Sequence, residues 1–491
     1  MRSSCSSLCF VLLFAPAAST FLYGSAASQD PLPACTQLQV LCNGEFCADV
    51  CADGAVALDA WLTNSIRFQY NLTRARSWRY GPILGTHNAF ISRTNGFGLI
   101  EDLASALYAR TGSVASTHVR VPNQRFGPKS LLDLGVRELE LDVWDTLVND
   151  KDFEVVVCHS PVPDPYSVVA LQQAADALGR GPLQYNPFAE LCSNKTAEWA
   201  FTQVGEWLAA NPDDVAELVL DNRVAAWNVD LIASAAQHVF GSTILTPPIL
   251  RDVFNNSWPS RDAMLQRGYR IIIESNSYLG NNYTGSVFET VVFWPTTWTD
   301  QPGPQDLAPF PNCTFDGSAS WYAHGLPRML DSGDLAFDPE SEDEKSILLK
   351  PVGLADAAAC GVNNVGVADV TPAALTGWVW SWAAGEPRRS PACAAMTLVR
   401  GQWTSEPCAD ARPALCRAGD TRVPAGASPE LWNFTEPVGL DGAAAACAAL
   451  GAGWAFDVPR DGRENAIVAQ AMLLGGAWTR GGAGVWLNAR V

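Results

Sequence analysis

Two carboxylates and a histidine mark the stretch of the sequence best suited to chemistry, at positions 134–159. The run from Val136 to Trp144 alternates apolar and acidic residues, so Glu140 and Asp142 are expected on one face of a strand, about 7 Å apart. A second apolar run follows and ends at His159. Clustered carboxylates raise each other's pKa unless a cation lies between them, and oxygen ligands suit a hard cation such as Ca²⁺.

The elements that would position these groups alternate between short strands and amphipathic helices. Polar residues end several of the strands: His87 and Asn88, His159, and Asp221. The pattern predicts parallel β/α units, and an α/β barrel or an open doubly wound sheet would carry its site at those strand ends. The expected strands are Tyr80–Thr86, Val136–Trp144, Asp213–Asp221, Tyr269–Glu274 and Asn364–Asp369, and the expected helices include Thr196–Ala210 and Asn228–Phe240.

Length and charge limit the class of protein. The 491 residues, 48% of them hydrophobic, suffice for two or three domains with a sizeable core. The net charge of −19 argues against nucleic acid as a partner and against electrostatic docking on anionic lipid. An acidic balance is compatible with an extracellular protein or with cation binding.

The N-terminus is expected to be a secretory signal peptide over residues 1–28, with Arg2 followed by an apolar run too short to span a bilayer. Its removal takes two of the fourteen cysteines and leaves an even number. We therefore expect a secreted, disulfide-bonded glycoprotein. Six sequons for N-glycosylation occur, at Asn71, Asn194, Asn255, Asn282, Asn312 and Asn433.

Residues 29–75 are expected to form a cysteine-rich segment followed by a helix over Ala57–Arg74. Four cysteines lie between Cys35 and Cys51. Cys47 and Cys51 have a spacing that a zinc site could use, but in a secreted chain two small disulfides are favoured.

Four motifs together resemble the catalytic X region of phosphatidylinositol-specific phospholipase C and the related PLC-like phosphodiesterases. They occur in the family's order: GTHN from Gly85, RELELDVWD from Arg137, CHS from Cys158 and LVLDN from Leu218. The resemblance implies a TIM-like (β/α) barrel over residues 76–385, following the small disulfide-rich segment.

The resemblance also implies the roles of the site residues. His87 and His159 would be the catalytic acid and base, and Ca²⁺, or less well Mg²⁺, would be held by Asn88, Glu140, Asp142 and Asp221. Glu140 could instead be the general base, and the sequence does not separate these roles.

The sequence departs from the family's pattern in three places, one of them Ala89, where Ser or Thr is common. Asp221 stands where the family usually has Glu, and the strand from Arg270 to Ser275 carries no lysine for extra ring phosphates. Recognition of a multiply phosphorylated inositol is therefore not expected.

The C-terminal part resembles a C-type lectin-like domain with its halves in reversed order. A cysteine-rich segment at 386–420 is similar to the second half, and residues 421–491 are similar to the first half, as a small α+β region. Carried over, the resemblance pairs Cys416 with Cys447 and Cys393 with Cys408. The halves would form either a permuted unit or a downstream copy cut short at Val491.

We expect a secreted phosphoric diester hydrolase that cleaves an inositol phospholipid or a glycosyl-inositol lipid and contacts membranes only peripherally. One alternative is an inactive barrel that binds glycans or a cell surface through its C-terminal region. Another is a glycerophosphodiesterase- or sphingomyelinase-like enzyme with a similar cation site.

Overall fold

A computed structural model describes most of the chain, and all of the described residues belong to one compact unit, Pro33–Val491. The expected signal peptide lies outside the described residues. None of the described helices is long and apolar enough to cross a membrane. The described residues are 35–99, 124–148, 152–159, 172–173, 175–176, 179, 181–186, 192–276, 282–295, 300–301, 307–314, 329–331, 351–367, 369–388, 392–398, 401–419, 429–474 and 484–490.

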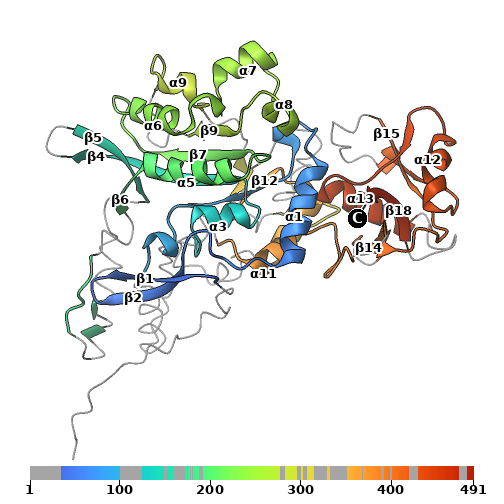
Figure 1. The fold of residues 1–491 in the computed structure, drawn as a ribbon, viewed down its shortest axis with the longest axis horizontal. Helices are drawn as coiled ribbons and strands as arrows, with labels where there is room; N and C mark the ends of the chain where they lie inside the picture. Colours follow the sequence, from blue (N-terminus) through green and yellow to red (C-terminus); the bar gives the residue numbers. More distant parts are fainter. Residues whose placement is uncertain are drawn as a thin grey trace, which may run out of the picture. The chain divides into compact units, whose positions relative to one another are not determined.

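Parallel strands form the centre of this unit (Figure 1). One sheet joins β4 (Glu138–Val148), β7 (Ala216–Asn222), β9 (Ile271–Ser275) and β8 (Ile244–Leu245), all parallel. A second parallel sheet has the order β10-β11-β12-β3, formed by β10 (Asp300–Gln301), β11 (Met329–Asp331), β12 (Asn364–Val367) and β3 (Ile83–Thr86).

The two sheets meet where β3 lies beside β4. The backbone amide of Arg137 donates to the carbonyl of Leu84 at 2.8 Å. The backbone amide of Ala89 donates to the carbonyl of Glu140 at 2.9 Å. The α/β class and the parallel units are thus as expected. Among the described residues no strand pairing joins β10 to β9 or β8, so the closed barrel remains a prediction.

The expectation of parallel strands is wrong for the strand that ends before His159. This strand, β5 (Asp152–Cys158), runs antiparallel to β4, with Val157 opposite Val143, and β6 (Cys192–Thr196) runs antiparallel to β5. The reason is the short connection: residues 149–151 alone separate β4 from β5, whereas a parallel crossover needs about a dozen residues or more. The Cys158–Cys192 disulfide ties β5 to β6.

Helices cover the outward face of the first sheet, where Leu139, Leu141 and Val143 are fully buried (Figure 1). The Thr196 hydroxyl caps the helix that packs there by accepting from the amide of Trp199 at 3.1 Å. The covering and flanking helices are α3 (Pro128–Asp133), α5 (Ala197–Ala210), α6 (Asp230–Phe240), α7 (Pro247–Phe254), α8 (Arg261–Leu265) and α9 (Phe288–Val291), and α10 (Pro351–Cys360) and α11 (Pro372–Leu375) flank the second sheet.

The N-terminal segment is a small antiparallel hairpin, β1 (Leu38–Asn43) and β2 (Phe46–Cys51), followed by α1 (Ala60–Leu72). Disulfides join Cys35 to Cys51 and Cys42 to Cys47. The prediction of two small disulfides is confirmed. The zinc alternative is wrong because each of the four sulfurs forms a disulfide and none is left to bind a metal.

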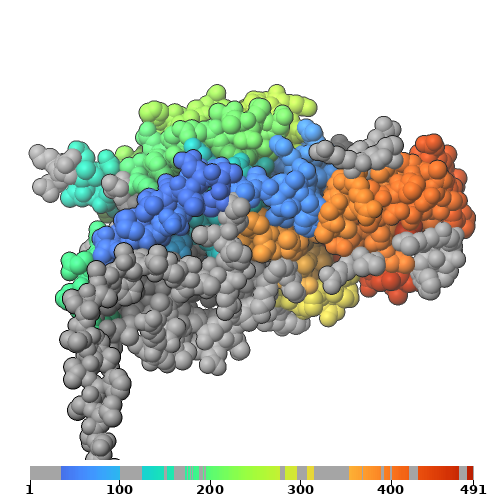
Figure 2. Space-filling view, turned by 60° about the horizontal axis from the view of Figure 1, so that its bottom comes forward, coloured from blue at the N-terminus to red at the C-terminus, as the bar shows by residue number. Residues whose placement is uncertain are grey.

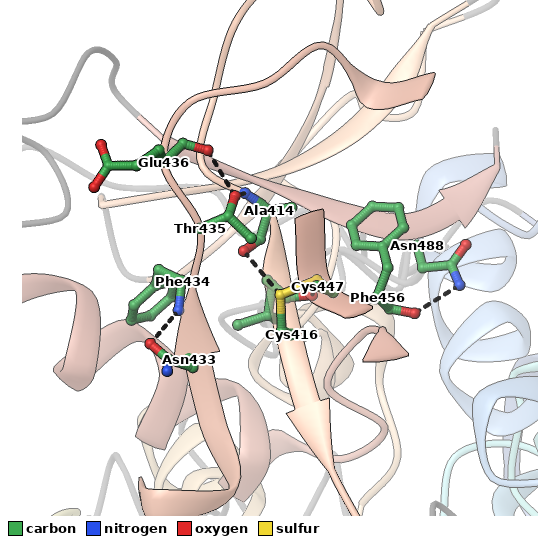
Figure 3. Close-up of a disulfide and its surroundings, with 10 residues drawn as sticks. Ala414, Cys416, Asn433, Phe434, Thr435, Glu436, Cys447, Phe456 and Asn488 are labelled. Carbon is green, nitrogen blue, oxygen red and sulfur yellow. Dashed lines mark hydrogen bonds between the residues drawn. A yellow bond between two sulfur atoms is a disulfide. The ribbon is translucent and has the colours of Figure 1, made fainter. Parts of the chain in front are cut away.

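The C-terminal region contains two three-stranded sheets and two helices. The last strand, β18 (Gly484–Arg490), pairs antiparallel with β13 (Cys393–Thr397), and Figure 3 shows the disulfide between Cys416 and Cys447. The second bridge joins Cys393 to Cys408, so both pairs implied by the resemblance are present. The other elements are β14 (Trp403–Glu406), β15 (Leu415–Ala418), β16 (Trp432–Phe434), β17 (Trp454–Phe456), α12 (Leu440–Ala448) and α13 (Gly462–Leu474).

These pairings join the two halves by hydrogen bonds and a disulfide, as a permuted unit requires. The small α+β composition is as expected. The likeness to a C-type lectin-like domain itself stays a prediction.

A buried ion-pair cluster connects the C-terminal region to the chain beside α1. Arg76 contacts Asp461 at 2.6 Å and Glu464 at 2.5 Å, and its side chain is 1% exposed. In the same junction the Gln69 side chain on α1 accepts from the amides of Trp380 and Ser381 at 3.0 and 3.1 Å. Figure 2 shows the corresponding blue and orange surfaces in contact.

Candidate active site

The structure brings the predicted site residues to one edge of the parallel strands. His87 and Asn88 directly follow β3, Glu140 and Asp142 lie in β4, and Asp221 lies near the end of β7. Asp142 and Asp221 are direct partners in the parallel register, so their Cα atoms lie at the same level. Because paired residues of parallel strands point to the same face, the two carboxylates share a face as well.

His159 reaches this edge by a different route from the one expected. Its strand runs antiparallel to β4, so the chain beyond Val157 runs back along β4 toward Asp142. The charges of His87, Arg223 and Asp221 all act on the His159 ring. The residue is therefore beside the cluster, although the antiparallel direction of β5 could not be inferred from an apolar run.

Glu140 is the carboxylate that organises the turn after β3. Its Oε2 lies 3.2 Å from Nδ1 of His87 and accepts from the backbone amide of Asn88 at 3.0 Å. Asn88 has a left-handed backbone, with φ of 49°, which asparagine tolerates better than most residues. This turn directs His87 and Asn88 toward β4.

Gly85 allows β3 to approach β4 this closely. A Cβ atom at this position would overlap the Oε2 atom of Glu138 and the Oδ1 atom of Asn364. Glu138 is itself almost fully buried on the same face of β4 as Glu140. A glycine is therefore required at this position of the GTHN motif, because the buried carboxylate of Glu138 occupies the space that a side chain would need.

The electrostatics of the cluster are those of crowded charges. Burial raises the pKa of Asp142 well above its usual range, and the negative charges of Glu140 and Asp221 raise it further, while His87 and Arg223 oppose them. Burial, together with the positive charges of His87 and Arg223, lowers the pKa of His159 to about 4, and the negative charge of Asp221 opposes this shift. Acidic and basic groups therefore lie within interaction range of one another.

Arg223 belongs to this cluster and was not singled out from the sequence. Its Nη2 and Nε atoms lie 2.9 and 3.2 Å from Oδ2 of Asp221, and its guanidinium lies 5.5 Å from the centre of the Trp144 ring. The available signal was its position two residues after Asp221, on the same side of an extended chain. No motif marked it.

The donor set suits a hard cation in its chemistry. The Oδ1 atom of Asp221 is buried and has no hydrogen-bond partner in the described part of the chain. Asn88, Glu140 and Asp142 would add oxygen ligands of the type that Ca²⁺ prefers. However, no group of three or more His, Cys, Asp and Glu side chains within the described residues is gathered to hold a metal ion, so these side chains would have to turn toward a shared ion.

A second charged cluster lies on the same face, near the other end of the strands. Arg79 contacts Glu274 and, at 2.9 Å, Glu217, and the indole of Trp78 donates to Glu217 at 2.6 Å. Burial lowers the pKa of Arg79, and Glu217 opposes this shift. These charges are paired and deeply buried, which indicates a structural role.

Comparison with known proteins gives relatives of unknown activity. No family model matches the chain. Uncharacterized proteins from two strains of Mycobacterium tuberculosis, CDC 1551 and H37Rv, are each 27% identical over 443 residues, which is 86% of this chain and 80% of theirs.

Solved structures with some similarity include phosphatidylinositol-specific phospholipase C from Listeria monocytogenes, at 12% identity and a TM-score of 0.37, over 64% of this chain and 97% of that one. The PLC21 protein of S. officinalis is 10% identical with a TM-score of 0.28, over 70% of this chain and 43% of that one. At these values the function of this chain has to be inferred from its own residues.

Proposed function

We propose that the chain is a secreted phosphoric diester hydrolase that cleaves an inositol phospholipid or a glycosyl-inositol lipid. The observation that carries the proposal is the meeting of two histidines with three carboxylates at one strand edge. His87 lies 3.2 Å from Glu140, and His159 interacts electrostatically with His87 and Asp221. The four phospholipase-like motifs that supply these residues support the substrate class.

The reaction that suits this set is an internal attack on the phosphodiester. A neighbouring hydroxyl of the headgroup forms the new P–O bond and gives its proton to a base, and the P–O bond to the lipid glycerol breaks. The leaving oxygen takes a proton from an acid, so the products are a cyclic phosphate and diacylglycerol. His87 and His159 would be this acid–base pair, with Glu140 either orienting His87 or acting as the base.

Positive charge near the phosphoryl oxygens would stabilise the transition state. Arg223 is such a charge on the chain itself, held 2.9 Å from Asp221. Ca²⁺, held by Asn88, Glu140, Asp142 and Asp221, would supply further neutralisation and would lower the pKa of the attacking hydroxyl. A titration with chelator separates the contribution of the cation from that of Arg223.

Exposed apolar residues close to this edge support peripheral membrane contact. Leu147 and Phe153 face each other across the β4–β5 hairpin and are 51% and 40% exposed, and Trp227 is 80% exposed. Asn228, next to Trp227, donates to Asp145 of β4 at 2.6 Å, which ties the two segments together. Large apolar side chains of this kind partition into the membrane interface.

The charges around these residues favour an uncharged lipid surface. The exposed Asp152 and Glu154 lie in the same hairpin as Phe153, and the whole chain carries a net charge of −19. Secretion is supported by six disulfides and by the exposure of five sequon asparagines, Asn71, Asn255, Asn282, Asn312 and Asn433.

The test is a headgroup-release assay on the purified protein with phosphatidylcholine vesicles that contain a minor share of phosphatidylinositol, with vesicles of phosphatidylcholine alone, or with vesicles of sphingomyelin. We expect inositol cyclic phosphate from the first vesicles only, detected by ³¹P NMR. His87→Ala and His159→Ala should lower turnover by about 10²-fold or more each. His238→Ala is the matched control, because His238 lies on α6 with a side chain 76% exposed and should keep wild-type activity. Hydrolysis that survives in either site variant would remove the catalytic assignment.

A further inference from the structure

A cavity of about 210 Å³ lies at the opposite end of β4 and β7 from the candidate active site. Arg137 immediately precedes β4 and Asp214 lies just before β7, and both line it. Asn64 and Arg67 of α1 and Trp207 of α5 complete the walls. Asn64 and Arg67 are exposed, so the cavity opens to solvent between helices.

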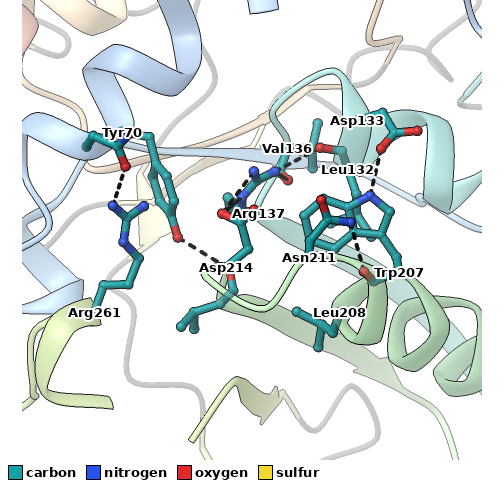
Figure 4. Close-up of polar contacts among 12 residues, drawn as sticks. Tyr70, Leu132, Asp133, Val136, Arg137, Trp207, Leu208, Asn211, Asp214 and Arg261 are labelled. Carbon is teal, nitrogen blue, oxygen red and sulfur yellow. Dashed lines mark hydrogen bonds and ion pairs between the residues drawn. The ribbon is translucent and has the colours of Figure 1, made fainter. Parts of the chain in front are cut away.

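The wall is built around the buried guanidinium of Arg137 (Figure 4). Its Nη1 donates to the carbonyls of Leu132 and Val136 at 2.8 and 2.7 Å, and its Nε and Nη2 donate to Asp214 Oδ1 at 3.3 and 3.2 Å. A guanidinium has five N–H groups, so one on Nη2 is left for a ligand. The side chain is 8% exposed and held by these hydrogen bonds, so its position is fixed before a ligand binds.

Hydrogen-bond acceptors also remain on the walls. Trp207 Nε1 donates to Oδ1 of Asp133 at 2.7 Å, which leaves the second oxygen of this exposed carboxylate. Asp214 is 5% exposed, and its Oδ2 accepts no hydrogen bond from the described residues. The side-chain Nδ2 of Asn211 donates to the carbonyl of Trp207 at 2.9 Å, and the side-chain oxygen of Asn211 accepts no hydrogen bond from any residue that the structure describes. The cavity thus offers one fixed donor among several acceptors.

The charges of the lining residues balance. Arg67 and Arg137 oppose Asp133 and Asp214, so an anion would meet two carboxylates and a cation would meet two guanidiniums. The faces of the Tyr70 and Trp207 rings are not available to a cationic ligand, because Arg137 already lies against both. Arg137 lies 5.1 Å from the Tyr70 ring and 4.9 Å from the Trp207 ring.

We propose that this cavity binds an uncharged, multiply hydroxylated molecule the size of one sugar ring. Hydroxyl groups both donate and accept, so one molecule can satisfy the carboxylate oxygens and the remaining Arg137 donor together. The volume of about 210 Å³ corresponds to about seven waters at roughly 30 Å³ each. It is below the roughly 300 Å³ at which sites for drug-sized ligands begin, which limits the ligand to a single ring.

Calorimetric titration of the full chain with glucose, galactose and mannose tests the proposal, with glucuronate and glucosamine as charged analogues. We expect saturable binding of at least one neutral hexose and at least tenfold weaker binding of both charged analogues. Asn64→Trp, which fills the mouth, and Asp133→Ala, which removes an acceptor, should each weaken hexose binding at least tenfold. Gln237→Ala, an exposed change on α6 away from the cavity, should leave it unchanged.

Three results would overturn the proposal. They are no binding of any neutral hexose, equal binding of a charged analogue, and hexose binding that both cavity variants retain, which would place the sugar elsewhere on the chain. Asn64 and Asp133 are exposed, so both variants should fold, and thermal unfolding curves verify this.

Discussion

Replacing Arg76 with methionine should destabilise the protein strongly, because it leaves the buried Asp461 without its cation and leaves Glu464 with the longer contact to Arg417, at 3.6 Å. Arg76 is paired with Asp461 at 2.6 Å and with Glu464 at 2.5 Å, and these side chains are at most 8% exposed. Methionine keeps most of the volume of the arginine stem, so the lost term is chiefly electrostatic. Removing one partner from a buried ion pair costs about 3–5 kcal/mol.

The adjacent ion pair on the surface supplies the matched control. Arg74 contacts Asp262 at 2.7 Å, but the two side chains are 54% and 31% exposed. Exposed pairs contribute about 0–1 kcal/mol, so Arg74→Met should change the free energy of unfolding by no more than that. The two substitutions are chemically identical and two residues apart, and they differ chiefly in burial.

Equilibrium unfolding in urea, followed by tryptophan fluorescence at pH 7, measures both variants. The Arg76→Met loss should shrink toward acid pH, because Asp461 can then be protonated. Burial and the charge of Glu464 already raise the pKa of Asp461, and Arg76 opposes that rise. The reasoning fails if Arg76→Met and Arg74→Met lie within 1 kcal/mol of each other, or if the Arg76→Met loss is the same at pH 5 and pH 7.

Three further changes test other parts of the structure. The double change Cys416→Ser and Cys447→Ser opens a bridge of sequence separation 31 and should cost about 4 kcal/mol in urea unfolding, and no loss would contradict the bridge. Asp142→Asn in chelator should unfold at higher temperature than wild type at pH 7. The folded-state pKa of Asp142 is raised above 3.8, so its penalty appears as pH rises through and beyond that value and should vanish near pH 3. Gly85→Ala should strongly lower both activity and stability, because the added Cβ would overlap the Glu138 carboxylate. A well-folded, active variant would refute the close packing of β3 against Glu138.

The proximity of the candidate site residues was largely predictable because these residues follow strand periodicity, whereas their catalytic and metal-binding roles stay predictions. The alternation around Glu140 and Asp142 places both on one face, and the β4–β7 register then sets Asp221 opposite Asp142. Polar residues at the ends of apolar runs gave His87 and His159. Arg223 was missed because a lone arginine after a strand has many ordinary explanations.

The direction of β5 could not be predicted from the apolar run that forms it. An apolar run predicts a strand but not its neighbour's direction, and here the short connection to β4 decides it. The cavity beside Arg137 was also beyond prediction, because its walls come from α1, α3 and α5, which are distant in sequence. The Cys393–Cys408 and Cys416–Cys447 bridges were predictable because the lectin-like resemblance implied these pairs, whereas the Cys158–Cys192 and Cys313–Cys360 bridges were not predicted.

The most direct test of the proposed function is the rate of inositol cyclic phosphate release from phosphatidylcholine vesicles that contain a minor share of phosphatidylinositol, measured in excess chelator and then with added Ca²⁺. The proposal predicts cyclic phosphate as the product, a rate that rises with Ca²⁺, and a loss of about 10²-fold or more in His87→Ala with Ca²⁺ present. Full hydrolysis in chelator would contradict the role of the cation. The absence of cyclic phosphate under both conditions, with the protein folded, would contradict the enzyme itself.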